Sequence, residues 1–296
     1  ISIQHPTVDP CAYADNWTLT SRSEADLKAA TLTLWDLCRA LHLPIANDKS
    51  WLWSTHPATR KRMSVWSIHN GRVPVKLTEC ELGTDVSYSK LTRKPKLKVR
   101  ISHAATRLTK VARLNIPLKH KVRIIRGGVW SKAFYGSEGH TIDRTSLKKL
   151  RTAAVRSFRC GCSGQNPLLV LNYTLLETAD PVIHTLQQRI RNLRAYLSMH
   201  PRSRESILAR LNANSNIKGP INALKQELTW AGFSHTADDC FRSPDGISIA
   251  VISDPPVNIK PCLMAAWDAV VCQKLAHRKY FSHSNIDTKA MQASFA

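Results

Sequence analysis

Hydrophobic and polar positions alternate near the start of the chain and then take helical spacing. Trp17 and Leu19 follow the dipeptide Asp15-Asn16 with a period of two, which predicts two short strands joined by a tight turn. Asp and Asn tolerate the positive φ of a two-residue hairpin turn, so these two residues are expected to fill the turn positions. A helix is predicted next, because apolar residues then recur along one helical face. These residues are Leu27, Ala30, Leu34, Leu37 and Leu41.

Polar signals set the expected ends of this helix, and strand-like runs surround it. Ser23, followed three residues later by Asp26, predicts a capping box at the start of the helix, and Pro44 is expected to end it. Short strand-like runs open the chain and follow the helix. The predicted strands cover residues 1–4, 46–54, 63–68 and 73–77.

Beyond residue 100 the pattern predicts three consecutive amphipathic helices. The first covers about 101–114, the second is opened by Pro117 and stopped by Gly136, and the third covers about 145–159. Their inward positions are expected to be Ile101, Ala105, Leu108 and Ala112 in the first, Val122, Ile125, Val129 and Ala133 in the second, and Leu147, Leu150, Ala154 and Phe158 in the third.

The remainder of the chain is predicted to be mainly helical, after a Gly- and Ser-rich linker over 160–167. Asp180-Pro181 opens a helix whose apolar residues have heptad-like spacing, which is typical of a core or of helix pairing. The apolar residues of this helix are Ile183, Leu186, Ile190, Leu193 and Leu197. Asp238-Asp239 is expected to be a solvated turn. Further helices are predicted at 203–212, 220–231 and 261–279, and a strand at 247–252.

The charge of the chain is concentrated in one segment. The 296 residues carry a net charge of +22, with 43 Lys and Arg against 21 Asp and Glu. Residues 90–159 contain 20 Lys and Arg and two acids, Glu138 and Asp143, so this segment alone holds +18. Such a localised excess favours a binding face for nucleic acid over a general solubility device.

Cysteine spacing and hydropathy limit the other classes of protein. The eight cysteines lack the Cys-x-x-Cys spacing of zinc sites, which favours free thiols in a reducing compartment. No apolar run approaches the length of a membrane span, so a membrane partner is not expected. We therefore expect an intracellular protein, nuclear or cytoplasmic and not secreted. Because the chain opens at Ile1 within a strand-like run, it is expected to be a piece of a longer protein.

Several motifs resemble those of one enzyme family. Tyr13-Ala14-Asp15-Asn16 resembles the Tyr-Ala-Asp-Asp box of reverse transcriptases, with Asn16 in place of the second Asp. Asn47-Asp48-Lys49-Ser50 resembles the Asn-x-x-Lys-Thr segment of the non-LTR retrotransposon type, with Ser for Thr and one residue fewer before Lys.

Two further motifs follow in the order that this family shows. Cys80-Glu81-Leu82-Gly83 stands where the family has a Leu-Gly hairpin that grips the primer. Phe134-Tyr135-Gly136-Ser137-Glu138 is similar to its Tyr-Gly-x-Glu segment in the helical thumb. The order of the motifs is more specific than any one of them.

The resemblance implies an α+β fold, with part of a polymerase palm over 1–89, a basic helical thumb over 90–160, and a helical region of unknown role over 165–296. It implies an RNA-directed DNA polymerase, a nucleotidyltransferase of a LINE-like retrotransposon, that uses Mg²⁺ or Mn²⁺. Its partners would be an RNA template, a DNA primer and the upstream part of the same polyprotein.

The resemblance also assigns roles to residues. Asp15 would be a metal ligand, Asn16 a weaker neutral ligand, and Lys49 would orient or protonate the leaving group. Leu82 and Gly83 would shape the primer grip. The basic residues expected to hold the duplex are Arg93, Lys94, Arg107, Lys110, Arg113, Lys119, Arg123, Arg126, Lys148, Lys149 and Arg151; the helical pattern places Lys132 and Arg156 outward as well.

Two parts of the family's machinery do not appear in this sequence. The family places its fingers and its first catalytic Asp upstream of the box, so this chain alone is predicted to be inactive as a polymerase. Two other hypotheses remain. The chain could be a non-enzymatic nucleic-acid-binding protein derived from such an element, or a helical assembly scaffold that uses the Ile183–Leu197 stripe.

Overall fold

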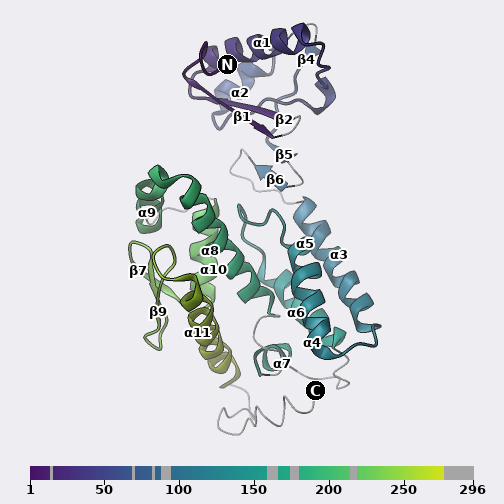
Figure 1. Cartoon of the computed structure of the whole chain (residues 1–296), viewed down its shortest axis with the longest axis vertical. Helices are drawn as coiled ribbons and strands as arrows, with labels where there is room; N and C mark the ends of the chain where they lie inside the picture. The colour runs from purple at the N-terminus through teal and green to yellow at the C-terminus, as the bar shows by residue number, and fades with distance from the viewer. Residues whose placement is uncertain are drawn as a thin grey trace. The chain divides into compact units, whose positions relative to one another are not determined.

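The computed structural model describes residues 1–13, 16–68, 71–81, 84–87, 95–158, 166–173, 180–213 and 219–276 (Figure 1). It combines helices with small antiparallel sheets, which confirms the α+β class. The chain divides into two compact units. The first comprises residues 1–79 and 86–92, and the second comprises residues 80–85 and 93–296.

The first unit begins with the predicted hairpin. Strands β1 (Val8–Tyr13) and β2 (Asn16–Ser21) pair antiparallel, with Tyr13 opposite Asn16 and Val8 opposite Ser21. The hairpin prediction is confirmed, but this register makes Asn16 a strand residue and not a turn residue. Asp15 lies outside the described residues.

Helix α1 (Glu24–Ala40) starts as predicted. The Ser23 hydroxyl accepts a hydrogen bond from Asp26 N at 3.2 Å, which satisfies a backbone donor of the first turn. The reciprocal half of the predicted capping box is not formed, because Ser23 N donates to Ser21 Oγ at 3.1 Å and the Asp26 carboxylate accepts from Thr7 Oγ1 at 2.6 Å. The helix ends before Pro44, because His42 takes a φ of +52°.

The buried face of α1 differs from the predicted stripe. Ala30 and Leu34 are buried, whereas Leu37 and Leu41 are 44% and 59% exposed. The prediction was wrong toward the C-terminal end of the helix. There the buried face turns toward Cys38 and leaves the two leucines in solvent.

The rest of the first unit contains less strand than predicted. Residues 1–4 form a turn closed by His5 N donating to Ile1 O at 2.7 Å, and 46–54 contains a 3-10 helix. Residues 73–77 provide only Val75, which bridges Leu52 in parallel. The elements are η1 (Asn47–Lys49), α2 (Pro57–Met63), β3 (Ser67–Ile68) and β4 (Gly71–Arg72). Their core is Leu52, Met63, Trp66, Ile68 and Val73.

Strands β5 (Thr78–Glu81) and β6 (Thr84–Ser87) form a two-stranded sheet on either side of Leu82 and Gly83. Those two residues lie outside the described part of the chain. In β6 the buried Asp85 carboxylate accepts hydrogen bonds from Leu97 N at 2.9 Å and Lys96 N at 3.2 Å. It thereby satisfies donors of the first turn of the next helix.

The three predicted basic helices are present. They are α3 (Pro95–Ala112), a continuous helix made of α4 (Leu118–Ile124), the π-helical turn η2 (Ile125–Trp130) and α5 (Ser131–Ala133), and α6 (Arg144–Ser157). The inward positions predicted for the second and third helices are all buried. The first helix starts at Pro95, earlier than predicted, and its buried residues are Leu97, Ala104, Leu108 and Val111.

The C-terminal part adds helices and one small sheet to the same unit. The apolar stripe from Ile183 to Leu197 is buried, which confirms it as core. The sequence did not predict α7, β7 or β8, and the last helix starts before Pro261. The elements are α7 (Pro167–Tyr173), α8 (Pro181–Met199), η3 (Pro201–Ser203), α9 (Arg204–Asn212), α10 (Pro220–Trp230), β7 (Ser234–Ala237), β8 (Cys240–Arg242), β9 (Ser248–Ala250) and α11 (Pro256–Ala276).

Asp239 corrects another prediction. It is 5% exposed, and its carboxylate accepts hydrogen bonds from Ile252 N and Ser253 N, both at 2.8 Å. Asp238-Asp239 does form a turn in which Asp238 is exposed, as predicted, but Asp239 is buried there and fixes the turn after β9.

One hydrophobic core runs through the second unit, from Leu97 of α3 to Leu275 of α11. A buried ion pair supports it, because the Arg189 guanidinium donates to both Glu227 carboxylate oxygens at 2.8 and 2.9 Å. Arg189 also donates to the backbone oxygens of Glu138 and His140. The basic helices are thus packed on the C-terminal helices.

Disulfides and membrane-spanning helices can be checked among the described residues. The six cysteines that the structure describes are not joined in disulfides. Among the described helices, none combines the length and apolarity needed to cross a bilayer.

Gly136 offers a test of how β6 packs on the basic helices. Its φ is +68°, and a Cβ there would lie 2.8 Å from Thr84 Cγ2 and closer still to Oγ1. We expect Gly136→Ala to lower the free energy of unfolding by about 2–4 kcal/mol, measured by urea denaturation. Gly139→Ala is the control, because its Cβ would meet nothing within 4 Å. Equal stability of the two variants would contradict this packing.

Candidate nucleic-acid interface

A groove of about 1000 Å³ runs between α3 and α6. Each helix buries one face in the core and turns the opposite, polar face toward this groove. On α3 the polar positions recur every three or four residues from Thr106, and on α6 they do so from Thr145. The floor is formed by small or apolar side chains: Ala105, Leu108, Ala112 and Ala153.

Cations and hydroxyl groups line the walls of the groove. The cations are Lys110, Arg113, Lys148, Lys149 and Arg156, and the hydroxyl groups belong to Thr106, Thr109, Thr145, Thr152 and Ser157. No Asp or Glu is among the lining residues. Such a surface suits a polyanion, because Lys and Arg neutralise phosphates and exposed hydroxyl groups such as those of Thr106 and Thr145 can donate hydrogen bonds to phosphate oxygens. The other three hydroxyl groups of the lining donate to carbonyl oxygens of their own helices.

The two acids of the basic segment are used elsewhere. Glu138 Oε1 accepts a hydrogen bond from Asn192 Nδ2 at 2.9 Å, and Asp143 accepts one from Ser146 N at 2.7 Å at the start of α6. Within the described part of the chain, none of the five groove cations forms an ion pair with an acid. No carboxylate of the described residues therefore holds these cations in an ion pair.

The predicted basic residues differ in where the structure places them. Four of them, Lys110, Arg113, Lys148 and Lys149, line the groove. Arg107 is half-buried on α3, and Arg93 and Lys94 lie outside the described residues. Lys119, Arg123 and Arg126 are exposed on the α4–η2 helix. The threonines were not predicted, although their helical spacing relative to the lysines indicates the same face.

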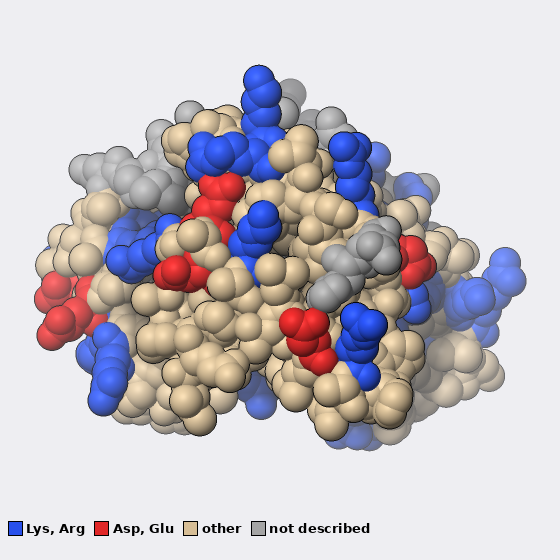
Figure 2. Space-filling view, turned by 90° about the horizontal axis from the view of Figure 1, so that it is seen from above, with Lys and Arg blue, Asp and Glu red and all other residues tan. Residues whose placement is uncertain are grey.

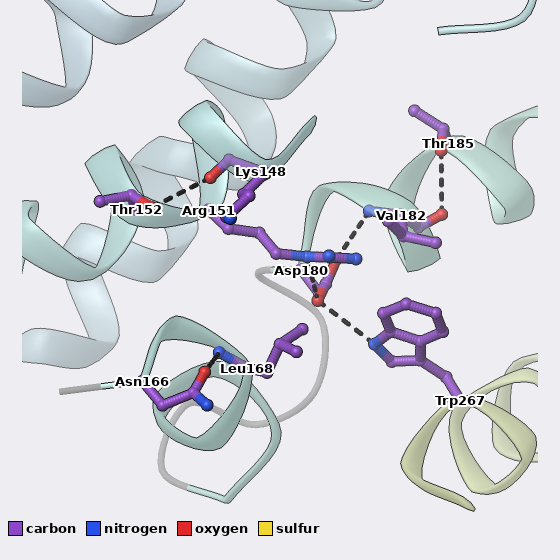
Figure 3. A network of polar contacts seen from close by, with 9 residues as sticks. All are labelled: Lys148, Arg151, Thr152, Asn166, Leu168, Asp180, Val182, Thr185 and Trp267. Carbon is purple, nitrogen blue, oxygen red and sulfur yellow. Dashed lines mark hydrogen bonds and ion pairs between the residues drawn. The ribbon is translucent and has the colours of Figure 1, made fainter. Parts of the chain in front are cut away.

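Arg151 contradicts its predicted role. It is 6% exposed and lies on the α6 face that carries Leu147 and Ala154, so it cannot reach a duplex. Its Nε donates to both Asp180 carboxylate oxygens, at 2.9 and 3.1 Å (Figure 3). A buried cation is tolerated here because this carboxylate compensates its charge.

Asp180 connects several elements around Arg151 (Figure 3). It accepts hydrogen bonds from Val182 N at 2.7 Å, which caps α8, and from Trp267 Nε1 at 3.3 Å. The Arg151 guanidinium lies 4.8 Å from the Trp267 ring centroid, as does Lys274 Nζ. The pKa of Lys274 is lowered by burial first and then by the charges of Arg151 and Arg144. This cluster is structural.

The distribution of charge differs between surfaces. Figure 2 shows Lys and Arg side chains dispersed over the visible face, among uncharged residues and several Asp and Glu. By contrast, acids are absent from the lining of the α3–α6 groove. The lining of the groove thus differs from the face in Figure 2, on which acids lie among the cations.

The predicted catalytic residues that the structure describes, Asn16 and Lys49, do not form a common site with other described residues. Asn16 is exposed in β2, and Lys49 is exposed in the 3-10 helix η1, so the prediction that Lys49 lies on a strand was wrong. In the described residues, no group of three or more His, Cys, Asp or Glu could hold a metal ion. Asp15, the predicted metal ligand, lies outside the described residues, so the metal site stays a prediction.

Comparison with known proteins adds no assignment: no family model, no curated protein and no solved structure matches the chain.

Proposed function

We propose that the chain binds duplex nucleic acid through its phosphate backbone, using the groove between α3 and α6. The observation that carries this proposal is the lining of the groove, which has five cations and no carboxylate. Phosphate contacts of this kind bind with little sequence preference. An RNA–DNA hybrid is the ligand that the resemblance to reverse transcriptases implies.

The wider proposal is that the chain is part of an RNA-directed DNA polymerase of a non-LTR retrotransposon. The motif order supports it, as do the β1–β2 hairpin that carries the box and the strands that flank Leu82-Gly83. In this proposal residues 1–89 belong to a palm, 90–160 to a thumb, and 165–296 support the thumb. RNA template, DNA primer and the upstream part of the polyprotein are its proposed partners.

A non-enzymatic nucleic-acid-binding protein is the second candidate. The amide of Asn16 in the box favours it, because an amide contributes no charge to a bound cation. The scaffold hypothesis loses its basis, because the Ile183–Leu197 stripe is buried in the chain's own core.

Salt-dependent binding tests the first proposal. If about six phosphates are neutralised, the logarithm of the association constant should fall with the logarithm of salt concentration at a slope near −5. The measurement is fluorescence anisotropy with a labelled RNA–DNA hybrid at several salt concentrations. A slope near zero, or no binding at low salt, would refute the proposal.

Primer extension tests the enzymatic part. We expect no DNA synthesis by this chain alone with Mg²⁺ or Mn²⁺, because two-metal catalysis needs fixed carboxylates and a positioned nucleotide. The family's fingers and first catalytic Asp precede the box. Extension on an RNA template above that of an Asp15→Ala control would show that the chain builds a metal site of its own.

A further inference from the structure

Two consecutive glycines lie on the exposed side of the π-helical turn η2. Gly127 and Gly128 are exposed, whereas Ile125, Val129 and Trp130 of the same turn are buried in the core. The turn interrupts an otherwise continuous helix from α4 to α5. Single π-helical turns inside α-helices are frequent at functional sites.

The fold of the chain does not require these glycines. Neither has a positive φ, and a Cβ at either position would meet nothing within 4 Å. Gly136, by contrast, has both a positive φ and a close neighbour. Glycine in a helix is also less stable than alanine. Glycine at 127 and 128 therefore lowers the stability of the helix, and the packing of the chain does not require it.

The surroundings of the two glycines are basic. Arg123, Gly127 and Ser131 are spaced four residues apart, so they lie along one exposed line of the helix, and Gly128 and Lys132 lie beside it. All five residues are exposed. We call them the diglycine face. No acid occurs between residues 114 and 137, so no carboxylate of this segment opposes an anionic ligand.

We propose that the diglycine face is a second contact for the nucleic acid, where the sugar–phosphate backbone lies directly against the peptide backbone. Glycine permits such an approach because it has no Cβ to hold the ligand away. Arg123 and Lys132 flank the bare segment and neutralise the phosphates on either side of it. This inference rests on the proposed function, since it assigns a second surface to the same ligand.

The test is the double variant Gly127→Ala/Gly128→Ala of the full chain, with the labelled RNA–DNA hybrid as the probe. We expect the melting temperature to rise by about 4–8 °C, because each of the two alanines favours the helix over glycine. We expect the dissociation constant to rise about tenfold, with an unchanged salt slope because no charge is removed. A loss of affinity in a more stable protein cannot be ascribed to unfolding.

Two further variants make the outcome specific. Gly139→Ala also adds a methyl group in open space, away from this face, and should leave affinity unchanged. Arg123→Gln should lower the magnitude of the salt slope by about one. Unchanged affinity of the double variant, or a fall in its melting temperature, would overturn the inference while groove binding stands. Failure of the wild-type chain to bind would instead overturn the proposed function itself.

Discussion

Replacing Asp180 with alanine is expected to lower the free energy of unfolding by about 3–5 kcal/mol. The Asp180 carboxylate is 1% exposed and compensates the buried charge of Arg151 at 2.9 Å. Without it, a cation with 8% of its side chain exposed would lack its anionic partner. The variant also removes the α8 cap and the acceptor for Trp267 Nε1. The measurement is the free energy of unfolding in urea.

Asp143→Ala is the matched control for this prediction. Asp143 also caps a helix through its carboxylate, which accepts from Ser146 N at 2.7 Å, but it is exposed. Loss of that cap should cost about 1 kcal/mol. If both variants lose the same stability, the buried ion pair contributes nothing beyond helix capping, and the structural role given to Arg151 is wrong.

Neutralising the four groove cations predicted from the sequence should abolish most of the affinity for a hybrid duplex. If each phosphate contact contributes about 1 kcal/mol, the binding free energy weakens by about 4 kcal/mol, which raises the dissociation constant roughly a thousandfold. The salt slope should change from near −5 to near −1.5, because four phosphate contacts disappear. The variant carries Lys110→Gln, Arg113→Gln, Lys148→Gln and Lys149→Gln.

A second variant with the same change in net charge distinguishes contacts in the groove from the effect of net charge alone. It replaces exposed cations outside the groove by glutamine: Lys61, Arg72, Arg202 and Lys260. The groove account expects this variant to retain an affinity close to that of the unaltered chain. If both variants lose affinity equally, the ligand responds to net charge and the groove is not the site.

Local signals predicted much of the fold. The period-two residues around the box gave the β1–β2 hairpin, and Ser23 gave the start of α1. The inward residues of α6, from Leu147 to Phe158, were identified by helical spacing alone. These features depend on neighbouring residues, so the sequence contains what determines them.

The errors occur where contacts distant in sequence decide the outcome. Helical spacing places Arg151 on the inward face with Leu147 and Ala154, but its charge favoured an exposed position, because its buried partner Asp180 is 29 residues away in the sequence. Asp239 was likewise taken for a solvated residue, because its partners are the backbone donors of Ile252 and Ser253. Pro261 was expected to open a helix that in fact begins at Pro256.

Only part of the candidate site was predicted, because the rest depends on contacts distant in the sequence. The cations of α3 and α6 follow from helical spacing, but the pairing of these two helices into a groove depends on tertiary packing. The exposed pair Gly127-Gly128 was not singled out either. Its meaning depends on knowing that neither glycine has a positive φ or a close neighbour.

Lysine footprinting of the complex tests the central claim most directly. The exposed lysines of the chain, free and saturated with the RNA–DNA hybrid, are acetylated and quantified by mass spectrometry. The account predicts that the hybrid protects Lys110, Lys148 and Lys149 of the groove, while the exposed Lys61 and Lys260 react equally in both samples. Full reactivity of the groove lysines in the saturated complex would contradict it.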